Sequence, residues 1–432
     1  GSAPSGASRF RVLRPHAEGG LGIVCLAQDE ELHREVALKE IKPQFATDVA
    51  SRNRFTLEAE ITGGLEHPGI VPVYGLGQYS DGRPYYAMRF IRGDSLKEAI
   101  EQFHAGSLKV ATPAPADVNA ATVIGESSAT PADSPDHTTL RPVLATAFQS
   151  VEFRKLLGRF IDVCQAIEYA HSRGVLHRDL KPGNIMLGKY GETLVVDWGL
   201  AKAAGKDDRF AGMDEATLVP SSGSSIEQTA DGSVIGTPAY MSPEQAAGRL
   251  EQLGPATDVY SLGATLYHVL TGRSSFAKLP LPELLKRVQS GQFPRPRQVN
   301  SHIPRALEAI CLKAMSLHPR DRYDSATAIA EDLEHWLADE PVNAHQETPF
   351  TAASRWVRKH RAWAMSGTAA ASIRMATWRF TWWRRESIGE FFPPVALFEG
   401  TPFEMTRINL VQVFMTLVLV VFFTSAFAKP QF

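Results

Sequence analysis

The sequence has little cysteine, no marked excess of charge of either sign and no internal repeat. Its 432 residues include only three cysteines, far apart, which excludes a disulfide framework or a cysteine-rich metal site. Lysine plus arginine number 45 and aspartate plus glutamate number 47, so no global positive field favours nucleic acid as a partner. No segment near the first residue has the pattern of a signal peptide. These features predict a globular chain in a reducing compartment.

Hydrophobic patterning divides the chain into a strand-rich part and a helix-rich part. Between residues 10 and 103, short apolar runs broken by Gly, Pro and Asp predict strands, with one helix over residues 53–65. Further on, the helical period predicts helices over residues 153–173, 259–270 and 306–336, and the second of these is apolar nearly all round. Such a helix is typical of a buried central element.

Three segments have side chains that are too polar or too small for a packed structure to be predicted. Residues 1–9 are expected to be a disordered start, and residues 104–142 a disordered insertion, because Ala, Thr, Ser, Pro and Asp dominate there. Residues 204–232 form a second polar stretch, rich in Gly and Ser.

The last part of the chain has the composition of a membrane anchor. Residues 342–386 interleave basic residues with tryptophan, which suits the headgroup layer, and nucleic-acid binding is the alternative for this patch. Residues 408–428 carry no charge and approach the length of about 20 residues that spans a bilayer. We predict a single membrane helix there, with a buried soluble helix as the alternative.

A glycine-rich segment and a lysine follow one another at the start of the strand-rich part. Gly19, Gly20 and Gly22 lie between two predicted strands, where backbone N–H groups can approach a phosphate closely. A simple hairpin turn explains these glycines equally well. Lys39 ends the apolar run of the next strand, where its ammonium can reach a phosphate or simply face solvent.

The decisive segment, residues 177–184, reads HRDLKPGN and follows the predicted helix over residues 153–173. Thirteen residues after Asn184, a short apolar strand ends in Asp197, within Asp-Trp-Gly. Carboxylate and amide oxygens are the protein ligands that Mg²⁺ prefers. A lone Asp-Trp-Gly would indicate only a turn, but at this spacing from Asn184 it predicts a metal site.

In combination, these segments resemble the signature of bacterial Ser/Thr protein kinases of the eukaryotic-like family, over residues 10–341. The resemblance implies an α+β, two-lobed protein-kinase fold, with a β-rich N-lobe and hinge over residues 10–103 and a helical C-lobe over residues 143–341. It also implies transfer of the γ-phosphate of ATP to protein Ser/Thr hydroxyls, with Mg²⁺, or alternatively Mn²⁺, as the metal.

The same resemblance assigns a role to each catalytic position. Lys39 holds the α- and β-phosphates and pairs with Glu58, while Asp179 orients and deprotonates the substrate hydroxyl. Lys181 steadies the transferred phosphoryl group. Asn184 and Asp197 bind the metal ion. Three residues are implied as structural: Asp258, which anchors the catalytic loop, and the buried ion pair of Glu244 and Arg322.

The remaining ATP-binding positions form the glycine-rich loop, the apolar walls around adenine and the hinge. They are Ala17, Glu18, Gly19, Gly20, Leu21, Gly22, Val24, Ala37, Met88, Arg89, Ile91 and Met186. Three residues depart from the family pattern: Ala17 replaces the first glycine, Trp198 the usual Phe, and Ser242 the usual Ala before Pro-Glu. None of these changes removes a catalytic group.

The resemblance also implies partners and location. We expect protein substrates, a cytoplasmic kinase domain anchored to the inner membrane, autophosphorylation in trans by a homodimer, activating phosphorylation within residues 204–234, and no nucleic-acid partner. Residues 387–432 resemble the beginning of the membrane subunit a of bacterial ATP synthase. A catalytically weak, pseudokinase-type signalling scaffold is the alternative. A proton-channel component would require several further membrane helices.

Overall fold

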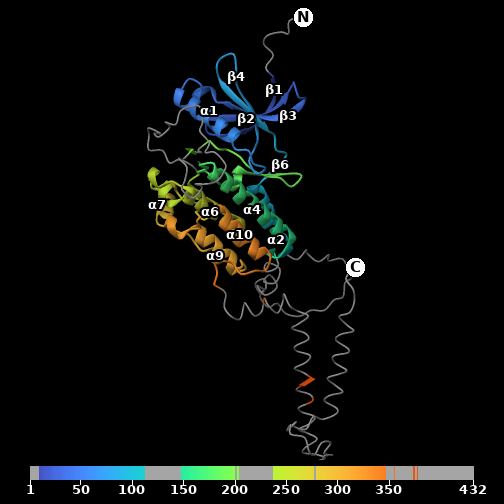
Figure 1. The fold of residues 1–432 in the computed structure, drawn as a ribbon, viewed down its shortest axis with the longest axis vertical. Helices are drawn as coiled ribbons and strands as arrows, with labels where there is room; N and C mark the ends of the chain where they lie inside the picture. Colours follow the sequence, from blue (N-terminus) through green and yellow to red (C-terminus); the bar gives the residue numbers. More distant parts are fainter. Residues whose placement is uncertain are drawn as a thin grey trace, which may run out of the picture. The chain divides into compact units, whose positions relative to one another are not determined.

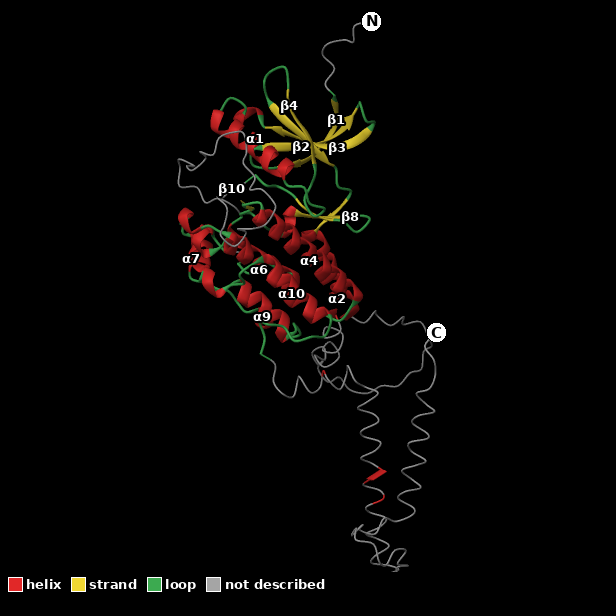
Figure 2. Ribbon diagram, in the orientation of Figure 1, coloured by secondary structure: helices red, strands yellow, loops and turns green. Residues whose placement is uncertain are grey.

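The structure is a computed structural model that describes residues 9–111, 147–199, 202–203, 237–276 and 279–346, together with four single positions beyond them. The chain divides into two units, residues 1–346 and 347–432, and the first contains the fold described below. In that unit the strands gather in one region and the helices in another (Figures 1 and 2). This arrangement matches the predicted two-lobed fold.

The strand region is a five-stranded antiparallel sheet in the order β1-β2-β3-β5-β4. Its strands are β1 (Phe10–Glu18), β2 (Gly22–Asp29), β3 (Arg34–Ile41), β4 (Val73–Gln78) and β5 (Pro84–Arg89). Helix α1 (Val49–Gly64) packs on the sheet through Phe55 and Ala59. The helix begins at its N-cap Asp48, whose carboxylate accepts a hydrogen bond of 2.9 Å from the Ser51 N–H.

The helical region is built around α6 (Pro255–Thr271), in which every residue from Thr257 to Leu270 is buried. The predicted buried central helix is thus confirmed. Around it lie α2 (Leu96–Ala111), α4 (Val151–Ser172), α5 (Pro243–Ala246), α7 (Leu281–Gln289), α8 (Pro296–Val299), α9 (Arg305–Ala314) and α10 (Ala326–Leu337). Helices α4, α6, α9 and α10 share one large apolar core.

Short strands and 3₁₀ turns complete this unit. The strands are β6 (Gly93–Ser95), β7 (Val175–Leu176), β8 (Ile185–Gly188), β9 (Thr193–Val195) and β10 (Lys202–Ala203). The turns are η1 (Pro43–Phe45), η2 (Pro182–Asn184), η4 (Pro238–Tyr240), η5 (Leu250–Gln252) and η6 (Pro319–Asp321).

The prediction of continuous helix over residues 306–336 is wrong. The chain forms α9, then the turn η6, then α10. The first helix already ends at Ala314, and Pro319, which has no N–H to donate, disfavours helical conformation in His318 before it. A new helix then begins at Ser325, whose hydroxyl accepts a hydrogen bond of 3.1 Å from the Ala328 N–H.

The predicted disordered insertion also starts too early, because helix α2 continues through residue 104 to Ala111. His104 lies against the helical core, with 3.0 Å between its Nε2 and the carbonyl oxygen of Val269. Leu96 and Ile100 belong to the large core, so α2 packs with the helical region and not with the sheet. Residues 112–142 lie outside the described part of the chain.

Across the described ranges, no helix combines the length and the apolar character needed to cross a bilayer. The predicted membrane helix over residues 408–428 and the predicted phosphorylation segment over residues 204–234 lie outside those ranges. Both therefore stay predictions.

Candidate functional site

The glycine-rich segment connects β1 and β2 through a tight turn closed by a hydrogen bond of 2.9 Å from Gly19 N–H to Gly22 C=O. A side chain at Gly22 would bring its Cβ to 2.8 Å from the Glu40 carbonyl oxygen, so the backbones approach more closely than another residue allows. Ala17 pairs with Val24 within the β1–β2 ladder, where a side chain is accommodated.

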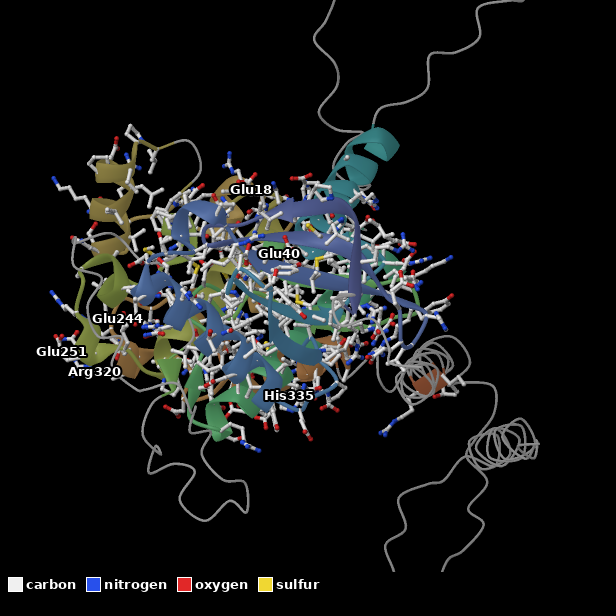
Figure 3. All side chains as sticks on the ribbon, turned by 90° about the horizontal axis from the view of Figure 1, so that it is seen from above. Glu18, Glu40, Glu244, Glu251, Arg320 and His335 are labelled. Atoms are coloured by element: carbon white, nitrogen blue, oxygen red, sulfur yellow. The ribbon has the colours of Figure 1, made fainter. Side chains whose placement is uncertain are left out.

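An ion pair holds one side of this turn. The carboxylate of Glu18 lies 2.7 Å from the ammonium of Lys42, just after β3. Figure 3 labels Glu18 and Glu40 over the strand region. The Lys42 N–H also donates to the Leu21 carbonyl oxygen at 2.9 Å, so the turn is attached to the end of β3 by backbone as well as side chain.

Strand register aligns the residues predicted to surround adenine. Ala37 on β3 pairs with Met88 on β5, Val24 on β2 pairs with Lys39, and Met186 on β8 pairs with Leu194 on β9. In the predicted hinge, the Arg89 N–H donates to the Pro72 carbonyl oxygen at 3.0 Å.

Lys39, Glu58 and Asp197 meet between the sheet, α1 and the loop after β9. The Lys39 ammonium forms an ion pair with Glu58 Oε1 and lies 3.6 Å from Asp197 Oδ1. Burial alone would lower the pKa of Lys39, but the carboxylates of Glu58 and Asp197 raise it above its ordinary value. The lysine is therefore a fixed positive charge at neutral pH.

The catalytic segment that follows β7 is held in one conformation by its own side chains. Lys181 Nζ lies 2.7 Å from Asp179 Oδ2, and the side-chain amide of Asn184 donates to the Asp179 carbonyl oxygen at 2.9 Å. Asp258, at the start of α6, accepts hydrogen bonds from the N–H groups of His177 (2.9 Å) and Arg178 (2.8 Å). The segment thus rests on the buried central helix.

Asn184 and Asp197, the two residues predicted to bind a metal ion, lie on neighbouring segments. A hydrogen bond of 2.9 Å from Val196 N–H to the Asn184 carbonyl oxygen joins the two segments that carry them. Because the Asn184 amide nitrogen is used by Asp179, its side-chain oxygen is the atom that can meet a cation. The Asp197 side chain is 47% exposed and its backbone has φ of 64°, a conformation seen at functional sites.

The charge at Asp197 suits a cation. Desolvation would raise the pKa of its carboxyl group, but Lys39, His177 and Lys181 lower it below the ordinary value. Within the described ranges, no group of three or more His, Cys, Asp or Glu side chains could hold a metal ion. Mg²⁺ is often held by only one or two protein groups, with phosphate and water completing its shell, so the Asn184 and Asp197 pair fits it.

The aromatic residue after Asp197 is fully packed. Trp198 is 1% exposed, and its ring lies against His177, with ring centroids 4.6 Å apart. Its indole N–H is buried with no hydrogen-bond partner among the residues whose structure is described. A phenylalanine would fill part of this space without leaving a buried donor unpaired.

The three residues predicted to be structural are placed in the helical core. Glu244 and Arg322 form a two-point ion pair, with both nitrogen–oxygen distances 2.8 Å. Glu244 lies at one side of the unit (Figure 3). Asp258 also contacts His171 Nε2 at 2.8 Å, and His171 and the two backbone donors surround its carboxylate.

Two residues that the sequence reasoning missed join the site. Thr237 donates its N–H to Asp179 Oδ1 and accepts a hydrogen bond from Lys181 Nζ, both at 2.7 Å. Its position in the segment Thr-Pro-Ala-Tyr was a usable signal. Tyr86 donates its hydroxyl to Glu58 Oε1 at 2.7 Å, and nothing in the sequence distinguishes it from any other buried strand residue.

Comparison with known proteins gives one matching family model and several similar proteins. The family model described as the protein kinase domain matches residues 136–335. The serine/threonine-protein kinase PknD of Protochlamydia amoebophila is 34% identical over 334 residues, which is 76% of this chain and 30% of the relative. PknD of Chlamydia pneumoniae is 34% identical over 345 residues, covering 77% of this chain and 31% of the relative. The chain therefore spans about a third of the length of these relatives.

Proposed function

We propose that this chain is a serine/threonine protein kinase that transfers the γ-phosphate of ATP to Ser or Thr hydroxyls of protein substrates. One observation carries the proposal. Lys39 contacts both Glu58 of helix α1 and Asp197, while Asp179 and Lys181 lie together on the adjacent loop.

In the proposed reaction, the Asp179 carboxylate accepts the hydrogen bond of the substrate hydroxyl and takes its proton as the phosphoryl group is transferred. Thr237 N–H and Lys181 hold this carboxylate from two sides, which fixes its orientation. Lys181 places a positive charge beside the transferred group, and Lys39 does the same for the α- and β-phosphates. Bound Mg²⁺ supplies neutralisation of charge on the phosphates. The chain contributes mainly positioning and electrostatic stabilisation.

From the sequence alone, we further propose that the protein autophosphorylates in trans as a homodimer and that residues 408–428 anchor it to the inner membrane. The likeness of residues 387–432 to ATP synthase subunit a is kept as an interpretation of the tail, with no transport activity assigned. A pseudokinase-type scaffold remains the alternative function, and it differs from the main proposal in having no phosphate transfer.

The test is Mg²⁺-dependent transfer of labelled phosphate from ATP to the chain itself or to a generic protein substrate. Asp179→Asn and Asp197→Asn should both lower transfer by at least roughly 100-fold. Only Asp197→Asn should also weaken Mg²⁺-dependent binding of ATP, because Asp179 does not face the metal. Asp81→Asn, in the exposed turn between β4 and β5, is the matched control. Absence of transfer by the unmodified chain would favour the scaffold.

A further inference from the structure

Tyr86 lies in the middle of β5 with its side chain directed at helix α1. It is 2% exposed and packs in a small cluster with Ile41, Phe55 and Ala59. Its ring is tilted against that of Phe55, with centroids 5.4 Å apart. Phe55 precedes Glu58 by one helical turn, so the ring contact and the ion pair act on the same stretch of α1.

The hydroxyl of Tyr86 makes a specific contact within this apolar cluster. It donates to Glu58 Oε1 at 2.7 Å, the same oxygen that receives the Lys39 ammonium. Burial and, after it, the nearby Glu58 carboxylate raise the pKa of Tyr86 well above its ordinary value. The phenol therefore remains a protonated donor throughout the neutral range, and Glu58 Oε1 is held by two donors from two strands.

A movement of α1 away from the sheet would separate these groups. The Tyr86 hydroxyl would then lose its acceptor while its ring stays among apolar side chains, and a buried polar group without a partner is unfavourable. The contact thus favours the position of α1 in which Glu58 reaches Lys39. We propose that Tyr86 is a positioning residue that holds Glu58 against Lys39 and so favours the arrangement competent for phosphate transfer. This inference rests on the proposed function.

The adjacent residue provides a matched control. Tyr85 points to the opposite face of the same strand, where its ring contacts Phe10 and Tyr79 at centroid distances of 6.1 and 4.6 Å. Tyr85→Phe removes a hydroxyl from the same strand without touching Glu58. Tyr86→Phe keeps the ring and removes only the donor.

The experiment compares steady-state transfer by the full chain, Tyr85→Phe, Tyr86→Phe, Glu58→Gln and the double variant Tyr86→Phe/Glu58→Gln. We expect Tyr86→Phe to lower kcat/KM for ATP by about 10-fold, the size of a hydrogen bond to a charged group, and Tyr85→Phe to change it less than about twofold. In the Glu58→Gln background, Tyr86→Phe should have little further effect, because the two act as one unit. Equal losses in both backgrounds would assign Tyr86 to packing alone and overturn the inference.

A second measurement does not depend on the folding of Tyr86→Phe or on activity. Incorporation of 3-fluorotyrosine at position 86 keeps the hydroxyl, and its ¹⁹F resonance should shift on Glu58→Gln but not on Glu40→Gln, which alters a carboxylate bonded to Tyr79 instead. No shift with Glu58→Gln would overturn the inference even if the enzyme is active. If the unmodified chain transfers no phosphate, the proposed function fails, and this resonance still decides whether Tyr86 holds Glu58.

Discussion

Two buried glutamates each form an ion pair with a cationic side chain: Glu58 in the strand region and Glu244 in the helical region. The two pairs differ in the contacts that surround the cation. Arg322 uses all five of its N–H donors: two for Glu244 and three for the carbonyl oxygens of Ala256, Ser316 and Leu317. Lys39, in contrast, divides its contacts between Glu58 and the half-exposed Asp197.

This difference indicates that the ion pair of Glu244 and Arg322 supports the stability of the fold, whereas the ion pair of Glu58 and Lys39 supports the site. Arg322 and Glu244 are both buried within the helical region, so the pair cannot rearrange without leaving polar groups unsatisfied. The partners of Lys39 come from helix α1 and from the loop after β9, two elements outside the sheet that carries the lysine. The first pair should therefore govern unfolding, and the second should govern activity.

The largest expected effect is the loss of stability when the ion pair of Glu244 and Arg322 is broken. Arg322→Met leaves Glu244 buried without its cation and should lower the free energy of unfolding by about 3–5 kcal/mol. Urea unfolding followed by circular dichroism measures it. The double variant Glu244→Met/Arg322→Met should recover much of the loss, because no unpaired charge remains. A single variant as stable as the parent would break the comparison.

Acid sensitivity should come from a different contact in the same region. Tyr240 Oη lies 2.7 Å from His268 Nδ1, and burial lowers the pKa of His268 to about 4. The unfolded chain takes up this proton near pH 6.5 and the folded chain only near pH 4, so stability falls as the pH drops through that window. The loss should be of the order of 3 kcal/mol for this site.

His268→Asn should flatten the slope of stability between pH 6.5 and 4. Over most of this range the Glu244–Arg322 pair should contribute no slope, since Arg322, through its hydrogen bonds and charge, outweighs burial and lowers the pKa of Glu244 below its ordinary value. Thermal unfolding at a series of pH values tests both statements. An unchanged slope in His268→Asn would show that another group titrates there.

Breaking the ion pair of Lys39 and Glu58 should affect activity more than stability. Lys39→Met should lower kcat/KM by roughly 100-fold, since one positive group facing the phosphates is removed. It should lower the free energy of unfolding by less than Arg322→Met does, because Lys39 donates one hydrogen bond to Glu58, whereas Arg322 donates two to Glu244 and three to backbone carbonyl oxygens. Kinetics and urea unfolding on one preparation measure both. A stability loss as large as that of Arg322→Met would contradict the distinction.

The smallest expected effect concerns the end of the helical region. Buried Asp332 accepts hydrogen bonds from Tyr323 Oη (2.6 Å) and from the N–H groups of Asn343 (2.6 Å) and Ala344 (3.0 Å), and Val342 packs in the core. A chain ending at residue 341 should be less stable than one ending at 346 by about 2 kcal/mol. Equal thermal midpoints for the two would show that this segment adds nothing to the fold.

The sequence by itself determined the parts in which chemistry and local geometry are contiguous. The order His-Arg-Asp-Leu-Lys-Pro-Gly-Asn places Asp179, Lys181 and Asn184 on one short loop, so their mutual contacts follow from a few backbone dihedrals. The nearly continuous apolar character of residues 259–270 likewise predicts burial on all sides, and α6 has it.

Only the tertiary structure decided which distant residues share an atom. Glu58 Oε1 is contacted by Lys39, 19 positions earlier, and by Tyr86, 28 positions later, because α1 packs on the face of the sheet that both strands present. Thr237 reaches Asp179 across 58 positions in the same way. Burial at Tyr86 predicts an apolar environment, but a hydrogen bond within it depends on the position of a neighbouring helix, which no local pattern in the sequence specifies.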